Sequence, residues 1–335
     1  MKKQVIYVWV SLVMLFVCSS AFSQKALPAN ETIVHDPVMI QQNGVYYLFC
    51  TGHGISVFSS KDMKNWTKEK PVFETQPAWA TTVAPDFKGH IWAPDVSYHN
   101  GQYYLYYSVS SFAKNTSAIG VATNKTLDAT SKDFKWEDHG IVIQSVPNRD
   151  LWNAIDPNLI FDENNTPWLT FGSFWNGLKM VKLGADLLSI AKQPEEWYTV
   201  ARRERSFKLE DKDPGDAALE APFVFKKDGW YYLFLSWDYC CRGENSTYKV
   251  VVGRSKTVTG PYLDATGKDL NQGGGTLVVE GNKNWAGVGH NSAYTFGGKD
   301  YLIFHAYEIA KKGRPILTIK EMKWKDGWPA VKPMN

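Results

Sequence analysis

Five short runs of apolar and aromatic residues recur along the chain, each beginning at a turn residue or directly after one. They are GVYYLF at 44–49, GQYYLYY at 101–107, PWLTF at 167–171, GWYYLF at 229–234 and GKDYLIF at 298–304. Further strand candidates flank the runs, for example at 118–122 and 249–253, and almost nothing between 31 and 328 keeps a helical period. The pattern therefore predicts short strands separated by turns.

The spacing of these runs indicates a repeated structural unit. Successive runs start about 60 to 70 residues apart, which leaves room for roughly four strands in each unit. Five such units predict an all-β, single five-bladed β-propeller over residues 24–335. A pair of β-sandwiches is the alternative, but no linker or shift in composition divides the chain.

Length and charge narrow the class of protein. By length alone, 335 residues would suggest two domains, whereas one closed ring explains the length without a second domain. The formal net charge is only +3, so nothing points to nucleic acid or an anionic membrane as a partner.

The first 23 residues have the features of a secretory signal peptide. Two lysines precede an apolar run from Val5 to Val17, and small residues lead up to a predicted cut between Ser23 and Gln24. Lipid attachment at Cys18 is an alternative. No other stretch is apolar enough for a membrane-spanning helix, so we expect an exported protein, in the periplasm or outside the cell.

After removal of the leader, three cysteines remain. Cys50 stands alone, and Cys240 and Cys241 are neighbours. Three cysteines form no disulfide framework, and their spacing matches no zinc site. The adjacent pair is compatible with two buried thiols or with a bridge between neighbours.

A polar residue precedes each of the five runs in an otherwise apolar setting. These residues are Asp36, Asp95, Asp156, Glu220 and His290. The first strand of each propeller blade lines the central channel, so we expect the five side chains at equivalent places to converge at one face of the ring. Carboxyl groups gathered in one cleft have their pKa values pushed apart, which provides an acid and a base in the same site.

Two carboxyl groups with aromatic platforms close by are typical of glycoside hydrolysis. Aromatic residues lie in or beside the same segments and are candidates either for stacking on sugar rings or for packing between blades. They are Trp79, Trp92, Phe112, Trp152, Phe174 and Trp175.

An ordered set of motifs resembles glycoside hydrolase family 43, in particular its endo-α-1,5-L-arabinanases. The resemblance covers His35 to Pro329. Its motifs are WAPD at 92–95, YYSVSSF at 106–112, SAIG at 117–120, NAIDPN at 153–158, FGSFW at 171–175, CCRG at 240–243 and GHN at 289–291.

The resemblance implies a five-bladed propeller and a reaction that inverts the anomeric carbon. By motif position, Asp36 matches the general base, Glu220 the general acid, and Asp156 the residue that raises the pKa of the acid and holds it in place. A calcium ion, bound largely through water, is implied near the histidine that matches His290. Inversion predicts that the Asp36 and Glu220 carboxyl groups lie roughly 6.5 to 9.5 Å apart.

The implied substrate is arabinan or its oligosaccharides, cleaved at internal linkages by a monomeric enzyme. A neutral arabinan chain also suits a nearly neutral protein. We expect substrate contacts from His35, Trp92, Asp95, Phe112, Asn153, Ser173 and Trp175.

One segment departs from the family pattern. Residues 202–218 are longer and more charged than expected ahead of the acid motif. They form either a solvated loop or a wall at one end of the cleft, which would restrict internal cleavage.

Three other functions compete with endo-arabinanase. An exo-acting arabinofuranosidase or β-xylosidase of the same family is the nearest. A β-fructosidase would need an Arg-Asp-Pro motif, but Arg149-Asp150 is followed by Leu151. A non-catalytic carbohydrate-binding propeller would be expected to lack one of the acids, and none is missing.

Overall fold

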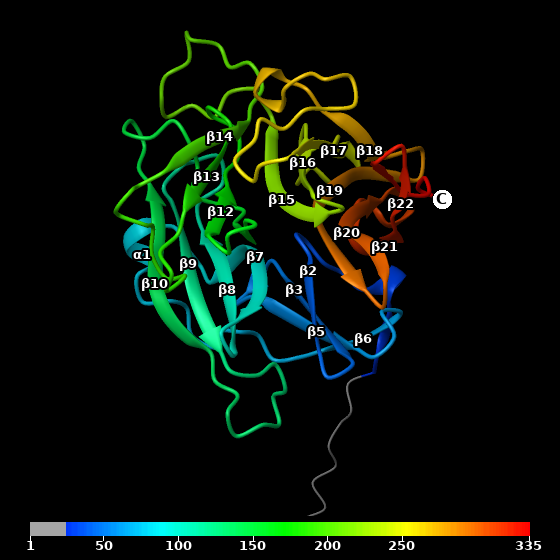
Figure 1. Cartoon of the computed structure of the whole chain (residues 1–335). Coiled ribbons are helices and arrows are strands. Elements are labelled where there is room, and N and C mark those ends of the chain that lie inside the picture. Colours follow the sequence, from blue (N-terminus) through cyan, green and yellow to red (C-terminus); the bar gives the residue numbers. More distant parts are fainter. Residues whose placement is uncertain (1–24) are drawn as a thin grey trace, which may run out of the picture.

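The computed structural model describes residues 25–335, so the predicted leader and Cys18 lie outside the described residues. The described chain forms five antiparallel sheets of three to five strands arranged around a central axis, and a separate two-stranded ribbon (Figure 1). This confirms the predicted five-bladed β-propeller.

The first three blades follow one another along the chain. Blade 1 consists of β2 (Val38–Gln42), β3 (Val45–Cys50), β5 (Ser56–Ser60), β6 (Asn65–Lys68) and β1 (Leu27–Pro28). Blade 2 consists of β7 (His90–His99), β8 (Gln102–Val109), β9 (Ser117–Asn124) and β10 (Glu137–Ser145), with β4 (Gly52–His53) paired to β7. Blade 3 consists of β11 (Asn158–Phe161), β12 (Pro167–Phe171), β13 (Leu178–Lys182) and β14 (Trp197–Ala201).

The remaining strands complete the ring. Blade 4 consists of β15 (Leu219–Lys227), β16 (Trp230–Trp237), β17 (Lys249–Ser255) and β18 (Thr276–Glu280). Blade 5 consists of β19 (Trp285–Phe296), β20 (Lys299–Glu308) and β21 (Arg314–Glu321), and a ribbon of β22 (Lys323–Lys325) and β23 (Trp328–Ala330) follows. The helical turns are α1 (Ala80–Val83), η1 (Ala29–Glu31), η2 (Gly243–Asn245), η3 (Leu270–Gln272) and η4 (Ile309–Lys311).

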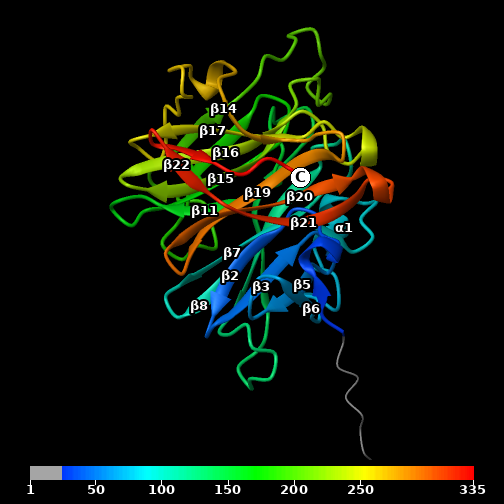
Figure 2. The same ribbon diagram turned by 90° about the vertical axis from the view of Figure 1, so that its right-hand side faces the viewer.

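The N-terminal segment closes the ring. Blade 5 has three strands of its own, and Ile33 forms an antiparallel bridge with Ile316 on the outer side of β21. The backbone N–H of Leu317 also donates to the carbonyl of Thr32 at 3.0 Å. Figure 2 shows β21 beside the blue strands of blade 1, so the two ends of the propeller are joined by main-chain hydrogen bonds.

The aromatic runs are apolar throughout because each is buried on both faces. In β16, Tyr231 and Leu233 pack into the core between blades 3 and 4, while Tyr232 and Phe234 pack into the core between blades 4 and 5. Successive side chains of a strand point to opposite faces of the sheet. Five hydrophobic clusters fill the five junctions between blades in this way.

Within residues 25–335, no helix is both long enough and apolar enough to cross a membrane.

Candidate active site

One backbone feature recurs where each blade begins. Five non-glycine residues have left-handed φ angles there: Asp36 (56°), Ala93 (38°), Asp156 (59°), Ala221 (57°) and His290 (49°). This conformation is unfavourable for residues with a side chain and persists where neighbouring contacts enforce it. In blades 2, 4 and 5 the strand register shifts at the same place, as in a β-bulge.

Side chains hold each of these residues from outside its own strand. The five backbone N–H groups donate to His305 Nδ1 (3.2 Å), Thr51 Oγ1 (2.8 Å), Ser108 Oγ (3.0 Å), Asp156 Oδ2 (3.1 Å) and Ser236 Oγ (2.8 Å), in chain order. Each acceptor belongs to the preceding blade, so adjacent blades fix the bulges against one another. The candidate site therefore stands on a rigid framework.

The structural repeat corrects the alignment predicted from the sequence. Asp36, Asp156 and His290 occupy the left-handed position, but Glu220 comes one residue before it and Asp95 two residues after it. The bulge changes the number of residues between the polar side chain and the following turn, which the sequence alone does not reveal.

Four of the five polar side chains nevertheless meet in one cavity. A cavity of about 1050 Å³ is lined by Asp36, Asp156, Glu220 and His290 together with other residues from all five blades. Asp95 is the exception, because it does not line this cavity.

Asp95 has a structural role, contrary to the expectation that it contacts substrate. Its side chain is buried, with the residue only 3% exposed, and it accepts hydrogen bonds from Asn158 Nδ2 at 3.3 Å and from the Leu159 N–H at 2.8 Å. Asn158 in turn accepts from the Val224 N–H at 2.8 Å. This chain of bonds joins the first strands of blades 2, 3 and 4.

Asp36 is held as a carboxylate. Its Oδ1 lies 2.8 Å from His35 Nδ1 and 2.9 Å from His290 Nδ1, and Thr51 donates its hydroxyl to Oδ2. Burial acts to raise the pKa of Asp36, but the charges and hydrogen bonds of His290 and His35 outweigh it and hold that pKa well below its usual value. An ionised, buried carboxylate of this kind suits a general base.

Glu220 is in the opposite state. Burial, reinforced by the negative charge of Asp156, raises its pKa to about 8. Burial also raises the pKa of Asp156, to about 6. Tyr248 donates its hydroxyl to Glu220 Oε1 and holds the carboxyl in place. Near neutral pH, Glu220 therefore keeps a proton that it can donate.

His290 lies among these carboxyl groups as a cation. Burial acts to lower its pKa, yet Asp36 and Asp156 raise that pKa to about 9. The Gly289 that precedes it has no room for a side chain, because a Cβ there would collide with the ring of Tyr248. The Gly-His sequence thus allows the tyrosine that holds Glu220 to pack close to the histidine.

The other candidate substrate contacts all lie at the cavity, but they differ in how much of the side chain is exposed to it. His35, Trp92, Phe112, Asn153, Ser173 and Trp175 all line the cavity. Phe112 is 74% exposed and offers a free aromatic face, whereas Trp175 is 1% exposed and donates its indole N–H to the Asp211 carbonyl at 2.9 Å. Trp175 therefore supports the wall of the cavity more than it offers a stacking surface.

Of the remaining aromatic candidates, Phe174 lines the cavity while Trp79 and Trp152 do not. Trp79 stacks on Tyr107 with ring centroids 5.9 Å apart, and Trp152 packs against Phe171 at 5.5 Å. Both pack between strands, which was the alternative left open by their positions in the sequence.

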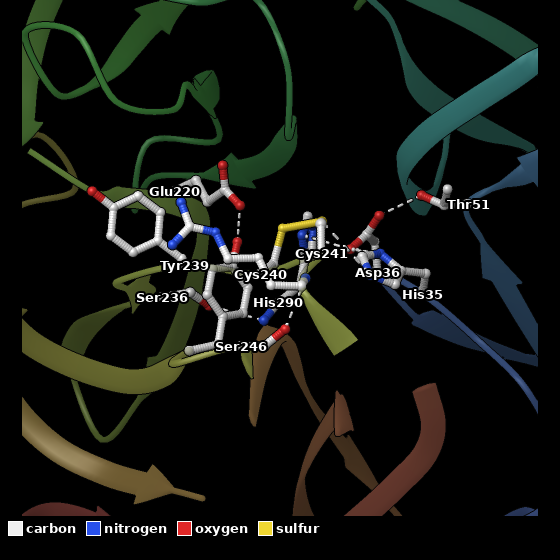
Figure 3. The surroundings of a disulfide bond; sticks show 12 residues. His35, Asp36, Thr51, Glu220, Ser236, Tyr239, Cys240, Cys241, Ser246 and His290 are labelled. Carbon is white, nitrogen blue, oxygen red and sulfur yellow. Dashed lines mark hydrogen bonds and ion pairs between the residues drawn. A yellow bond between two sulfur atoms is a disulfide. The ribbon is translucent and has the colours of Figure 1, made fainter. Parts of the chain in front are cut away.

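Several residues of the site were not anticipated. Thr51, Tyr248 and Tyr307 hold the carboxyl groups or their histidine partners, but each is a hydroxyl residue in or beside a strand and has no motif of its own. The Cys-Cys pair did carry a signal: Cys240 and Cys241 form a disulfide and both line the cavity (Figure 3).

The charged segment 202–218 is both a solvated loop and part of the cavity wall, the two alternatives that its sequence left open. Most of its residues are exposed, and Pro214 and Gly215 line the cavity. The guanidinium of Arg205 donates to the carbonyls of Glu210 (2.8 Å) and Asp213 (2.6 Å), so the loop is held in shape by its own side chain.

The comparisons with known proteins agree with this architecture. Residues 27–329 match the model for Glycosyl hydrolases family 43. The chain belongs to glycosyl hydrolase family 43. It is therefore an enzyme of a family that cleaves glycosidic bonds, built on the propeller described above.

Two relatives and one solved structure show how close the likeness is. The chain is 55% identical to the extracellular exo-α-(1→5)-L-arabinofuranosidase ArbA of Cellvibrio japonicus, over 96% of this chain and 92% of that protein. It is 42% identical to the extracellular endo-α-(1→5)-L-arabinanase 1 of Bacillus subtilis, over 90% and 88%. The structure of Cellvibrio cellulosa α-L-arabinanase with arabinohexaose superposes with a TM-score of 0.89 at 56% identity, over 90% and 96%.

Proposed function

We propose that this glycosyl hydrolase family 43 protein cleaves α-1,5-L-arabinofuranosidic linkages of arabinan with inversion. The single observation that carries the proposal is the pair of carboxyl groups with opposed pKa shifts, Asp36 lowered and Glu220 raised, in one cavity. The arabinan-cleaving relatives support the choice of substrate.

In this mechanism Glu220 donates its proton to the glycosidic oxygen as the bond to the anomeric carbon breaks. Asp36 accepts a proton from a water molecule, whose oxygen attacks that carbon from the opposite face. In the view of Figure 3, the two carboxyl groups lie on opposite sides of the Cys240–Cys241 disulfide. A separation of roughly 6.5 to 9.5 Å remains our expectation, because a water molecule must fit between base and sugar.

We further propose that the enzyme acts near chain ends, rather than at internal linkages as the sequence motifs predicted. The segment 202–218 supports this mode, because Pro214 and Gly215 form part of the cavity wall and the Asp211 carbonyl is fixed to Trp175. The exo-acting relative at 55% identity also favours it, whereas the endo-acting relative at 42% favours internal cleavage.

The products formed from linear arabinan test the mode of action. We expect short products of one size from the start and a slow fall in viscosity for each bond cleaved. Replacing residues 211–215 by a shorter Gly-Ser linker should open the cavity, because it removes Pro214 and Gly215 from the wall, and give a faster fall in viscosity for the same number of new reducing ends. A ladder of long products from the unaltered enzyme would establish internal cleavage instead.

The pKa shifts predict a bell-shaped dependence of kcat/KM on pH. Activity needs Asp36 ionised and Glu220 protonated, so it falls as the pH rises through about 8 and falls again at low pH, where Asp36 takes up a proton. Asp156→Asn removes a negative charge that raises the pKa of Glu220, and the alkaline limb should therefore move to lower pH. Asp133→Asn, on an exposed connection, is the matched control and should leave the profile unchanged.

Both the presence and the direction of a shift in the alkaline limb are informative. An alkaline limb that stays in place in Asp156→Asn would show that Asp156 does not modulate the acid. A limb that moves to higher pH would contradict the assignment of Glu220 as the group that must be protonated.

A calcium ion near His290 is also proposed. The carboxylate of Asp36 is already bonded to Thr51, His35 and His290, so few protein oxygens are free for a cation that takes roughly six to eight oxygen ligands. On the adjacent Asn291, the side-chain oxygen is buried without a hydrogen-bond partner among the described residues. These residues suit an ion held mainly by water, with the deprotonated His290 and Asn291 contributing ligands.

Metal removal tests the calcium proposal independently of activity. We expect calcium in the purified protein by elemental analysis, and a lower melting midpoint after EDTA treatment that added Ca²⁺ restores better than Mg²⁺. Since His290 must lose its proton to bind a metal, calcium affinity should rise with pH. A melting midpoint unchanged by EDTA would contradict a structural calcium ion here.

Export is proposed together with these functions. The leader at 1–23 lies outside the described residues, and the two relatives named extracellular support secretion of this chain.

A further inference from the structure

The disulfide between adjacent cysteines stands at the wall of the active-site cavity. Cys240 and Cys241 lie in the connection between β16 and β17, both line the cavity, and Cys241 is exposed. Cys241 also has a left-handed φ of 65°. A bond between neighbouring side chains closes a small ring that contains the intervening peptide, which reduces the conformations open to both residues.

A chain of hydrogen bonds leads from this disulfide to Asp36. The backbone N–H of Cys241 donates to the Tyr307 hydroxyl oxygen at 2.9 Å. The same oxygen lies 2.5 Å from His35 Nε2, and His35 Nδ1 lies 2.8 Å from Asp36 Oδ1. Cys241 and Asp36 come from blades 4 and 1, while Tyr307 comes from blade 5.

The donors at the two ends of this chain are fixed by their chemistry. The Asp36 carboxylate can only accept, so His35 donates to it from Nδ1, and the Cys241 N–H can only donate, so the Tyr307 oxygen accepts from it. The hydrogen bond between His35 Nε2 and the Tyr307 hydroxyl joins these two ends. His305 stacks on His35 with ring centroids 4.0 Å apart, which fixes the plane of the ring and leaves its in-plane direction to the hydrogen bond with Tyr307.

We propose that the Cys240–Cys241 disulfide is a positioning element for the catalytic base. By constraining the turn, it keeps the Cys241 N–H directed at Tyr307, which orients His35 and through it the carboxylate of Asp36. The inference rests on the proposed role of Asp36 as the base. The other role open to the disulfide, which lines the cavity, is a direct contact with sugar, and this makes a different prediction for kinetics.

Kinetics of the oxidised and reduced enzyme separate these roles. A dithiol such as dithiothreitol reduces the bond to two thiols and is itself oxidised to a cyclic disulfide. We expect kcat on linear arabinan to fall about 10-fold to 100-fold, since misplaced catalytic groups cost that much, with KM nearly unchanged. A direct sugar contact predicts the reverse, a higher KM at constant kcat, and that result would overturn the proposal.

Two variants show whether the effect passes through Tyr307. Cys240→Ser with Cys241→Ser should reproduce the loss of kcat and no longer respond to dithiothreitol. In Tyr307→Phe, which keeps the disulfide, reduction should cause no further loss, because coupled residues are not additive. If reduction lowers kcat of Tyr307→Phe by the same factor as it lowers kcat of the wild type, the path through Tyr307 is contradicted.

Controls keep the outcome interpretable. Cys50 is buried and burial raises the pKa of its thiol to about 12, so the thiols that appear on reduction should come from Cys240 and Cys241. Reoxidation of the wild type should restore kcat, even if the serine variants fold poorly. Failure of the proposed function would appear as no arabinan turnover by the oxidised enzyme, whereas failure of this inference leaves turnover intact and insensitive to reduction.

Discussion

Glu220→Gln is expected to lower kcat on arabinan by about 10²- to 10⁴-fold, the usual contribution of a general acid. Glutamine has nearly the same size and still accepts a hydrogen bond from Tyr248, but it has no acidic proton for the departing oxygen. An activated aryl arabinoside should be affected far less, because a nitrophenolate leaves without protonation. Comparing kcat on the two substrates therefore isolates the step that needs the acid.

The control for this variant is Glu210→Gln, the same change on an exposed residue of the 202–218 loop. It should keep full activity, and both variants should melt near the wild-type midpoint. Equal losses on arabinan and on the activated substrate would mean that Glu220 acts in binding or folding instead of proton transfer. Unchanged turnover on arabinan would remove Glu220 from the mechanism and favour a different acid.

The fold was predictable because a strand that is buried on both faces has a recognisable sequence pattern. A strand such as Trp230–Trp237 contributes side chains to two inter-blade cores, so it reads as an unbroken apolar run, and five such runs count the blades. The closure of the ring had no comparable pattern in the sequence. The bridge between Ile33 and Ile316 joins residues far apart in the chain, and neither belongs to a repeated motif.

The site was predictable only in part, for a related reason. Equivalent positions in successive blades face the same channel, so the acids near the start of each blade were expected to converge. Asp36, Asp156 and Glu220 do line one cavity. A bulge shifts the direction of a side chain without changing the local composition. Asp95 therefore looked equivalent to the others, although it joins blades through Asn158 and Leu159.

Asp36→Asn is expected to lower kcat by about 10²- to 10⁴-fold, and azide should restore part of the loss. Asparagine retains the shape of the side chain and can still bond to Thr51, but it cannot take a proton from water. Azide is already an anionic nucleophile and needs no base, so it can attack the anomeric carbon in the space left for water. The product should be the β-configured arabinosyl azide, identified by NMR, because attack comes from the face opposite the leaving group.

Azide distinguishes the base from the other carboxyl groups of the cavity. Glu220→Gln should gain nothing from azide on arabinan, because its leaving oxygen still lacks a proton donor. Asp156→Asn should also gain nothing, because Asp36 remains available to activate water. If azide rescued Glu220→Gln and not Asp36→Asn, Glu220 would be the general base and Asp36 the general acid. An azide product of retained configuration would show that a carboxylate of the enzyme attacks the sugar first. Asp36→Asn with azide thus tests, in one experiment, which residue is the base, from which face the nucleophile attacks, and whether the configuration is inverted.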